Sequence, residues 1–160
     1  MDIYVDHIKE YNLLQSLMQQ LPKVNPYTTL VINVSPDYSS TVAMQIAHYL
    51  SDEGKMLDLF ELDVPYPGET KEYYLEKFQK EFTEYVSKYD KVILCEAAVL
   101  SGKNYTWITK ALLEYGYKKE NIITVALLEM ESSIFKSNFV GEYINTMPEF
   151  YWERYNKNWD

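Results

Sequence analysis

The sequence predicts an α/β fold in three layers, with a mostly parallel central sheet flanked by helices. Two observations carry this prediction. Short apolar runs rich in β-branched residues alternate with longer segments in which apolar residues recur every three or four positions. Strands joined by crossover helices lie parallel, because a right-handed crossover places its helix over the sheet. The length of 160 residues suits a single domain, and we expect residues 1–160 to form one.

Residues 3–21 predict a helix at the N-terminus of the chain, because apolar side chains follow one helical stripe until Pro22. The run Thr29–Val34 is short, β-branched and almost wholly apolar, which is typical of a strand covered on both faces. A turn is expected at Ser35–Tyr38. Serines at the start of the next segment can cap a helix over 39–54, which a glycine closes.

The middle of the chain continues this alternation. Met56–Val64 predicts a second strand, which the loop Pro65–Gly68 ends. From Thr70 we expect a long amphipathic helix, with leucine and aromatic side chains inward and lysine and glutamate outward. Lys91–Cys95 predicts the third strand.

A turn at Glu96–Lys103 leads to a helix that Asn104 caps and Gly116 closes, and Asn121–Leu128 predicts the fourth strand. In parallel sheets, ligands bind outside the carboxyl ends of the strands, where turns lead into helix N-termini. We therefore expect the functional residues in the turns that follow the strands.

The composition argues against several classes of function. The chain has 15 Lys and Arg against 24 Asp and Glu, so its net charge of −9 would repel a nucleic acid backbone. No apolar run approaches the ~18 residues of a membrane span, and the N-terminus is acidic where a signal peptide is basic. The single cysteine, Cys95, excludes an intramolecular disulfide. We expect a cytoplasmic protein that binds neither nucleic acid nor membrane.

The turn after the third strand is the first candidate for a binding site. It places small residues, a hydroxyl and a glycine before a helix, so that backbone amides and the helix dipole can meet one anion. A tight turn with a helix cap and no ligand explains the same residues. The Walker phosphate loop fits poorly, because Ala97 stands at its first glycine and Asn104 at its metal-binding hydroxyl.

A longer pattern fits better. Glu96–Asn104 resembles the phosphoribosyl diphosphate motif of type I phosphoribosyltransferases in length and order, with an acidic start and a Ser-Gly ending. Ile134–Glu142 is similar to the K-P-D-[FY]-V-G segment of the purine enzymes. Phe150–Glu153 is similar to the aromatic tail of the xanthine and guanine members. The resemblance implies a phosphoribosyltransferase-like fold.

The resemblance also implies roles on the phosphoribosyl side of the site. Glu96 would be the catalytic and metal-binding residue, holding the ribose hydroxyls directly or through Mg²⁺. The second acidic position of the motif is occupied by Ala97, so half of this ribose clamp is absent. The implied ligands of the 5′-phosphate are Ser101, Gly102, Lys103 and Asn104.

On the base side, the resemblance assigns stacking to Phe139 and recognition of the base edge to the backbone of Val140, with Lys136 beside them. The alternative is that Phe139 is a core residue. The diphosphate loop expected at 35–40 departs from the family, because it has no glycine and no cation and contains Asp37. The family's catalytic hood, between the second and third strands, is also reduced.

The enzyme reading is transfer of a phosphoribosyl group between diphosphate and a purine-like base, with Mg²⁺ as cofactor. The alternative is a catalytically inactive protein of this fold, acting as a nucleotide sensor or a protein-interaction module. An unrelated flavodoxin-like domain leaves the segment 136–141 unexplained. We expect a nucleotide or phosphoribosyl diphosphate as ligand, with the monophosphate bound more tightly, and a homo-oligomer, specifically a dimer.

Overall fold

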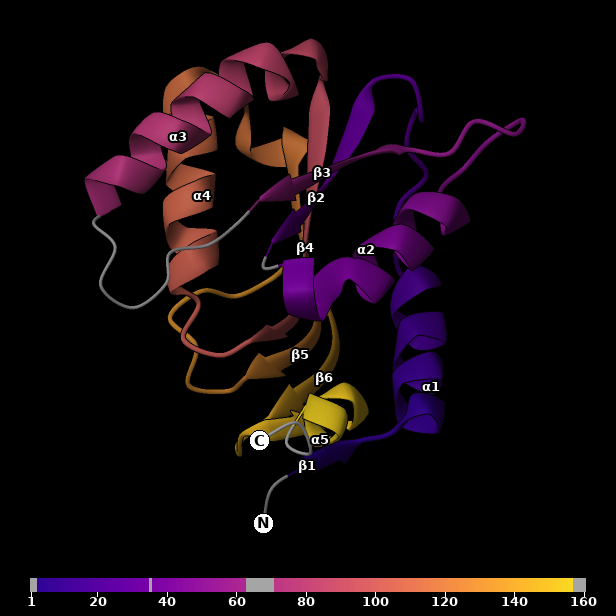
Figure 1. Ribbon diagram of the computed structural model, residues 1–160. Helices are drawn as coiled ribbons and strands as arrows, with labels where there is room; N and C mark the ends of the chain where they lie inside the picture. The colour runs from indigo at the N-terminus through magenta and orange to yellow at the C-terminus, as the bar shows by residue number, and fades with distance from the viewer. Residues whose placement is uncertain (1–2, 35, 63–70, 157–160) are drawn as a thin grey trace.

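The computed structural model describes residues 3–34, 36–62 and 71–156, except for the side chains of 36–40, 71–75, 77, 83 and 154–156. Its centre is a five-stranded sheet with the order β3-β2-β4-β5-β6, in which every pairing is parallel (Figure 1). The strands are β2 (Thr29–Val34), β3 (Asp58–Leu62), β4 (Lys91–Val99), β5 (Ile122–Met130) and β6 (Phe139–Ile144). The predicted parallel sheet is confirmed.

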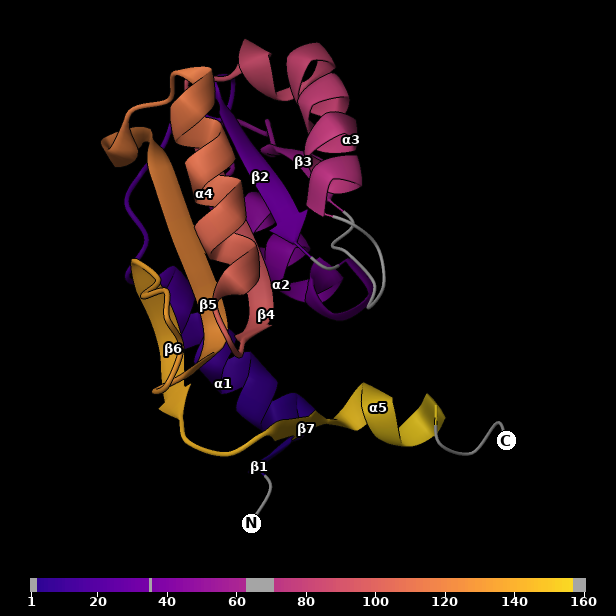
Figure 2. The same ribbon diagram turned by 90° about the vertical axis from the view of Figure 1, so that its left-hand side faces the viewer.

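Helices cover both faces of this sheet (Figures 1 and 2). The helices α1 (His7–Met18) and α2 (Pro36–Tyr49) pack on one face, and α3 (Lys71–Glu84) and α4 (Lys103–Tyr115) pack on the other. Side chains of β4 alternate between the two cores, since Cys95 joins the α1–α2 core and Leu94 the α3–α4 core. The three-layer prediction is therefore confirmed. None of the described helices is long and apolar enough to cross a lipid bilayer.

The N-terminal helix begins later than its periodicity predicts. Residues 3–5 form the strand β1 (Ile3–Val5), which pairs in parallel with β7 (Pro148–Phe150). The helix α1 starts after Asp6, whose Oδ1 accepts a hydrogen bond from the Lys9 amide at 2.7 Å. The β1–β7 pair and the short helix α5 (Tyr151–Asn156) lie near the end of the sheet at which α4 begins (Figure 2).

The connection between β2 and α2 is shorter than expected. Helix α2 begins at Pro36, so residues 36–38 are helical rather than part of a turn. Proline suits the first turn of a helix, because its fixed φ is already helical and the missing amide would have had no partner there. The serines predicted as caps therefore lie inside α2.

Both central strands also run further than predicted. Strand β4 continues past Cys95 to Val99, which places Glu96 inside a strand rather than in a turn. Strand β5 continues to Met130 and includes Glu129. Each carboxylate interrupts the apolar pattern, and each is buried with a hydrogen-bonding partner that only the folded chain supplies.

Candidate functional site

The candidate site lies where β4 ends and α4 begins (Figure 2). Residues 100–102, here called the β4–α4 turn, connect the two elements. The sequence-predicted residues Glu96 and Asn104 lie on either side of this turn, and the structure brings them together. The Asn104 side-chain amide donates a hydrogen bond to Glu96 Oε1 at 3.1 Å.

Glu96 is a nearly buried carboxyl group. Its side chain belongs to the central strand β4, opposite Ala126 of β5, and the residue is 9% exposed. Burial raises the pKa of Glu96 to about 7, although the hydrogen bond from Asn104 opposes this rise. Glu96 is therefore a mixture of carboxylic acid and carboxylate at neutral pH, able to accept hydrogen bonds in both forms.

The neighbouring position cannot complete an acidic pair. Ala97 is fully buried and belongs to the α1–α2 core, on the opposite face of the sheet from Asn104 and α4. A carboxylate here would have to be buried among apolar side chains, which is costly without a compensating charge. A small apolar residue at position 97 is therefore consistent with the packing of β4 against the α1–α2 core.

The turn itself depends on Gly102. This residue has a φ of +78° and precedes the first turn of α4, so the helix is capped at Gly102 and not at Asn104 as predicted. The Ser101 hydroxyl accepts a hydrogen bond from the Lys103 amide at 3.3 Å. Among the described residues, no acceptor contacts the amides of Asn104 and Tyr105, as is usual in the first turn of a helix.

Residues 131–138, here called the cover loop, pack directly on the turn. A Cβ on Gly102 would stand 2.5 Å from Ser133 Oγ and 2.7 Å from the Phe135 amide nitrogen. The Ile134 amide also donates a hydrogen bond to the Ser101 carbonyl at 3.1 Å. This contact was not predicted from the sequence, in which Gly102 is its one local signal.

Tyr105 fixes the start of α4 against the sheet. Its ring is fully buried, and its hydroxyl lies within hydrogen-bonding distance of the carbonyls of Leu94 and Val125. Burial raises the pKa of Tyr105, and the nearby Glu96 adds to this effect, so the hydroxyl remains a donor. The position of α4 relative to β4 and β5 is thereby fixed next to the site.

Lys136 makes contacts within the chain. Its ammonium donates a hydrogen bond to the Glu131 carbonyl at 3.0 Å and lies 3.7 Å from Glu129 Oε1. Glu129 is fully buried, and its other oxygen accepts a hydrogen bond from the Ser137 amide at 2.9 Å. This arrangement ties the cover loop to the end of β5. One sequence feature indicated this arrangement, namely the position of Glu129 near the end of an otherwise largely apolar strand.

Phe139 lies away from Glu96. It is half-buried at the first position of β6, opposite Val125, and packs against the α1–α2 core. Glu96 approaches α4 on the other face, so the structure does not bring these two side chains together. Val140 is in register with Ala126, which is in register with Glu96, so its side chain shares the face of Glu96 two strands away.

Other predicted parts of the site lie outside the described residues. They are residue 35, the side chains of 36–40, including Asp37, and residues 63–70, which connect β3 to α3. Within the described residues, no three His, Cys, Asp or Glu side chains form a group that could hold a metal ion. Glu96 alone could offer Mg²⁺ a carboxylate at this turn, so the described part of the chain does not fit a metal held by protein ligands alone.

Comparison with solved structures shows the fold. A purine phosphoribosyltransferase from Pyrococcus horikoshii Ot3 matches with a TM-score of 0.68 and 17% identity, covering 95% of each chain. The xanthine-guanine-hypoxanthine phosphoribosyltransferase of Helicobacter pylori matches with a TM-score of 0.67 and 12% identity, covering 99% of this chain and 96% of that chain. A hypothetical protein from Neisseria gonorrhoeae with bound ppGpp matches with a TM-score of 0.64 and 10% identity, covering 98% and 96%.

No family model and no curated protein matches the sequence. The fold is therefore that of the type I phosphoribosyltransferases, as the sequence resemblance predicted, and this likeness is one of structure. At identities of 17% or lower, it does not carry the activity of these proteins over to this chain.

Proposed function

We propose that this protein binds a 5′-phosphorylated ribose or a nucleotide at the β4–α4 turn. The observation that carries the proposal is the contact between Glu96 and Asn104, which places a carboxyl group beside the first turn of a 13-residue helix. A carboxyl group accepts hydrogen bonds from ribose hydroxyls, and the amides and dipole of a helix N-terminus favour a phosphate. Glu96 would bind the ribose hydroxyls of a ribose 5-phosphate, and the adjacent start of α4 would bind its phosphate.

The structural neighbours support this choice of ligand. Two of them are purine phosphoribosyltransferases, and the third, from Neisseria gonorrhoeae, contains bound ppGpp. Proteins of this fold thus include one with a bound nucleotide. Lys103 adds an exposed ammonium at the first position of α4, where it can approach a phosphate.

Between the two functions that the sequence left open, we favour nucleotide binding without efficient transfer. A magnesium ion that accompanies a diphosphate is usually held by carboxylates. Here Ala97 faces the core and Glu96 is partly protonated at neutral pH, so the described residues offer that ion little negative charge. Mg²⁺ would have to arrive with the ligand's own phosphates. Transfer to a purine-like base is the second candidate, favoured by the fold of the two enzymes. A cytoplasmic dimer remains part of the proposal.

Calorimetric titration of the full chain tests the proposal. GMP, ppGpp and phosphoribosyl diphosphate are each titrated with and without MgCl₂, and diphosphate release is followed with guanine, xanthine or hypoxanthine. We expect GMP to bind more tightly than phosphoribosyl diphosphate, with no steady release of diphosphate. Tighter binding of phosphoribosyl diphosphate together with turnover would establish the transferase instead. Absence of binding by all three ligands up to about 1 mM would overturn the proposal.

A further inference from the structure

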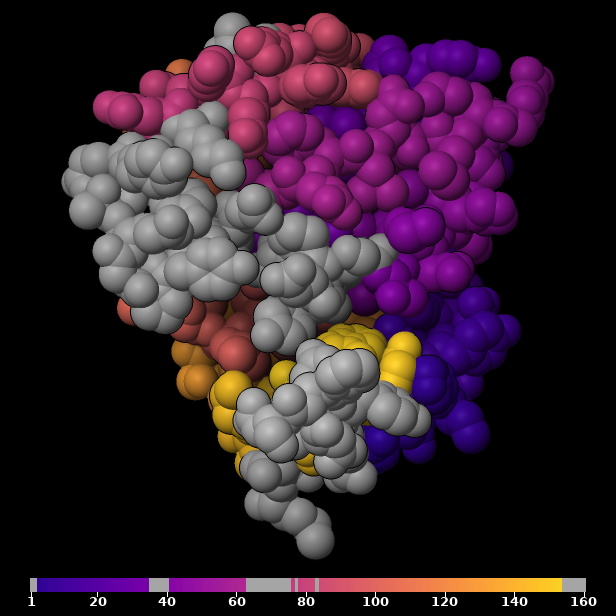
Figure 3. Space-filling model, viewed as in Figure 1, coloured from indigo at the N-terminus to yellow at the C-terminus, as the bar shows by residue number. Residues whose placement is uncertain are grey.

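Strand β3 is an edge strand of the central sheet in the part of the chain that the structure describes. It pairs with β2 through a continuous register, from Leu30 with Asp58 to Val34 with Leu62, and with no other described strand. Strand β3 contains no proline, lysine or bulge, and its charged side chains are the two exposed carboxylates of Asp58 and Glu61, which disfavour pairing with an acidic strand. Figures 1 and 3 view the molecule from the side of this strand. Its outward backbone groups could accept a further strand.

A groove lies beside this edge, between β3 and the region where α3 ends. Its volume is ≈ 590 Å³. We call it the β3 groove. The side chains that determine its chemistry are Asp58, Phe60, Glu61, Glu81, Tyr85 and Tyr89.

The charged groups of the β3 groove are carboxylates. Asp58 is already paired, because it accepts Lys55 Nζ at 2.6 Å and the Tyr89 hydroxyl at 2.7 Å. Glu61 and Glu81 have no ion-pair partner among the described side chains. The groove therefore carries uncompensated negative charge in a chain whose net charge is −9. A basic occupant is complementary to it, whereas a second copy of this chain is not.

The aromatic groups of the β3 groove suit the same occupant. Tyr85 is 56% exposed, and its ring centroid lies 6.1 Å from that of Phe60. The ammonium of Lys88 lies 5.5 Å from the centroid of the Tyr85 ring. Aromatic faces attract lysine and arginine, and the contact with Lys88 shows that the Tyr85 ring is accessible to an ammonium group.

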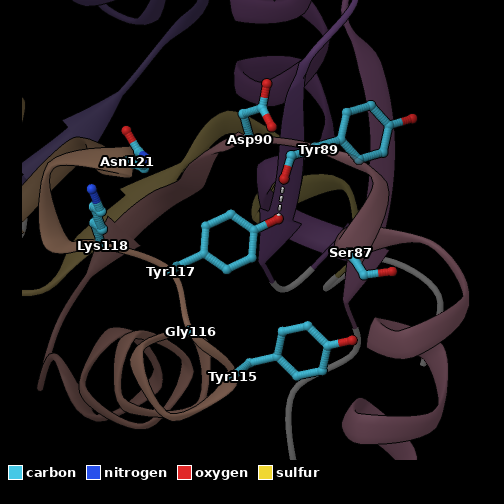
Figure 4. Close-up of a pocket in the computed structure, with 8 residues that line it drawn as sticks. All are labelled: Ser87, Tyr89, Asp90, Tyr115, Gly116, Tyr117, Lys118 and Asn121. Carbon is cyan, nitrogen blue, oxygen red and sulfur yellow. Dashed lines mark hydrogen bonds between the residues drawn. The ribbon is translucent and has the colours of Figure 1, made fainter.

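A second hollow continues the groove beyond Tyr89, which lines both cavities. It has a volume of ≈ 270 Å³ and lies between the end of α4 and the start of β4 (Figure 4). The Tyr117 hydroxyl lies within hydrogen-bonding distance of two carbonyls, that of Val86 at 2.7 Å and that of Tyr89 at 2.6 Å, which holds its ring in the wall. Burial raises the pKa of Tyr117 to about 12, so this side chain is neutral at physiological pH. Asp90 adds a carboxylate to the hollow and Lys118 adds an ammonium, so the unpaired negative charge lies in the β3 groove.

We propose that the β3 groove binds an extended, lysine-rich or arginine-rich segment of a partner protein, which adds to β3 as an outer strand. Backbone hydrogen bonds to β3 supply affinity, as in other cases of strand addition. Cationic side chains on one face of the added strand meet Glu61, Glu81 and the ring of Tyr85. Strand β2 separates β3 from β4, and the groove is lined by none of the residues that the proposed nucleotide site uses.

Fluorescence anisotropy with the full chain tests this proposal. The probe is a labelled peptide of alternating lysine and valine, and it is compared with its glutamate counterpart. A version methylated at alternate backbone nitrogens cannot pair with a strand. Spermidine serves as a competitor that has charge but no backbone. The variant E61K/E81K reverses the charge of the groove, and E53K/E114K makes the same change in net charge at exposed positions that line neither the groove nor the hollow beside it.

We expect saturable binding of the lysine peptide, weakened at least about 10-fold by E61K/E81K and by backbone methylation, and weakened much less by E53K/E114K. Equal weakening by the two double variants would show a nonspecific charge effect and overturn the proposal. Strand addition would be overturned if the methylated peptide bound as tightly as the unmethylated one. It would also be overturned if spermidine displaced the lysine peptide at the same total concentration of positive charges. No binding of the lysine peptide would overturn it as well. GMP binding is measured on the same variants and should be unchanged, because no residue of the groove belongs to the proposed nucleotide site. Failure of one proposal can therefore be told apart from failure of the other.

Discussion

The Asn104 side chain donates a hydrogen bond to Glu96 Oε1 across 3.1 Å, and this contact joins the start of α4 to the central strand β4. Asn104 was predicted to cap the helix, but Gly102 occupies that position and leaves the amide free to meet the carboxyl group. A nearly buried acid is thus held at the point where the parallel sheet presents its ligands.

We expect Glu96→Gln to stabilise the protein at alkaline pH. Burial raises the pKa of Glu96 from 4.5 to about 7, so the folded chain binds this proton more tightly than the unfolded chain. The resulting stabilisation is fully present below about pH 4.5 and is lost as the pH rises through about 7. Glutamine keeps the acceptor for Asn104 without the charge. Its advantage over the wild type should grow by at most roughly 3 kcal/mol between pH 5 and 8, measured by urea unfolding. A constant difference at both pH values would contradict this.

Gly102→Ala should lower the free energy of unfolding by about 2 to 4 kcal/mol. Its Cβ would stand 2.7 Å from a backbone nitrogen of the cover loop, at a φ of +78° that alanine rarely adopts. Gly116→Ala is the matched control, since its φ is +113° and its Cβ would have no atom within 4 Å. That variant should lose only about 1 to 2 kcal/mol from backbone strain. Equal losses in thermal or urea unfolding would show that the cover loop yields to the new methyl group.

Lys103→Ala should weaken binding of GMP about 3- to 10-fold, because one ammonium near a phosphate contributes on the order of 1 kcal/mol at a protein surface. Lys110→Ala provides the control on the same helix. Lys110 is exposed, and its Nζ lies 3.7 Å from Oε1 of Glu114, the residue one turn after it in α4. Calorimetry should show no change in GMP affinity for the control, and equal weakening by both variants would mean that the phosphate is not bound at the start of α4.

Lys136→Ala distinguishes two roles for this lysine. The structure ties its ammonium to the cover loop and to the buried Glu129. We therefore expect a loss of about 1 kcal/mol in unfolding free energy, since the lysine is half exposed, with GMP affinity nearly unchanged. Weaker GMP binding with unchanged stability would instead support the base-binding role that the sequence resemblance implies.

The order of strands and helices could be predicted because it is recorded in local patterns. β-branched apolar runs such as Thr29–Val34 predict strands buried on both faces, and this strand was located to the residue. Strand ends were less predictable where a polar residue stands in a buried strand, as Glu96 does in β4. The ligand-binding roles assigned from the resemblance all remain predictions, namely those of Glu96, Ser101, Gly102, Lys103, Asn104, Lys136, Phe139 and Val140.

The sequence by itself determined the parallel three-layer architecture, the strand Thr29–Val34 and the glycine-containing turn before α4, because periodicity and turn chemistry are local properties. Only the tertiary structure decided which side chains share a face. Register across β4, β5 and β6 places Phe139 on the α1–α2 face, away from Glu96, and packing brings Ser133 against Gly102. Such contacts join segments distant along the chain, and their geometry depends on strand register and on the volumes that fill each core, which no local pattern specifies.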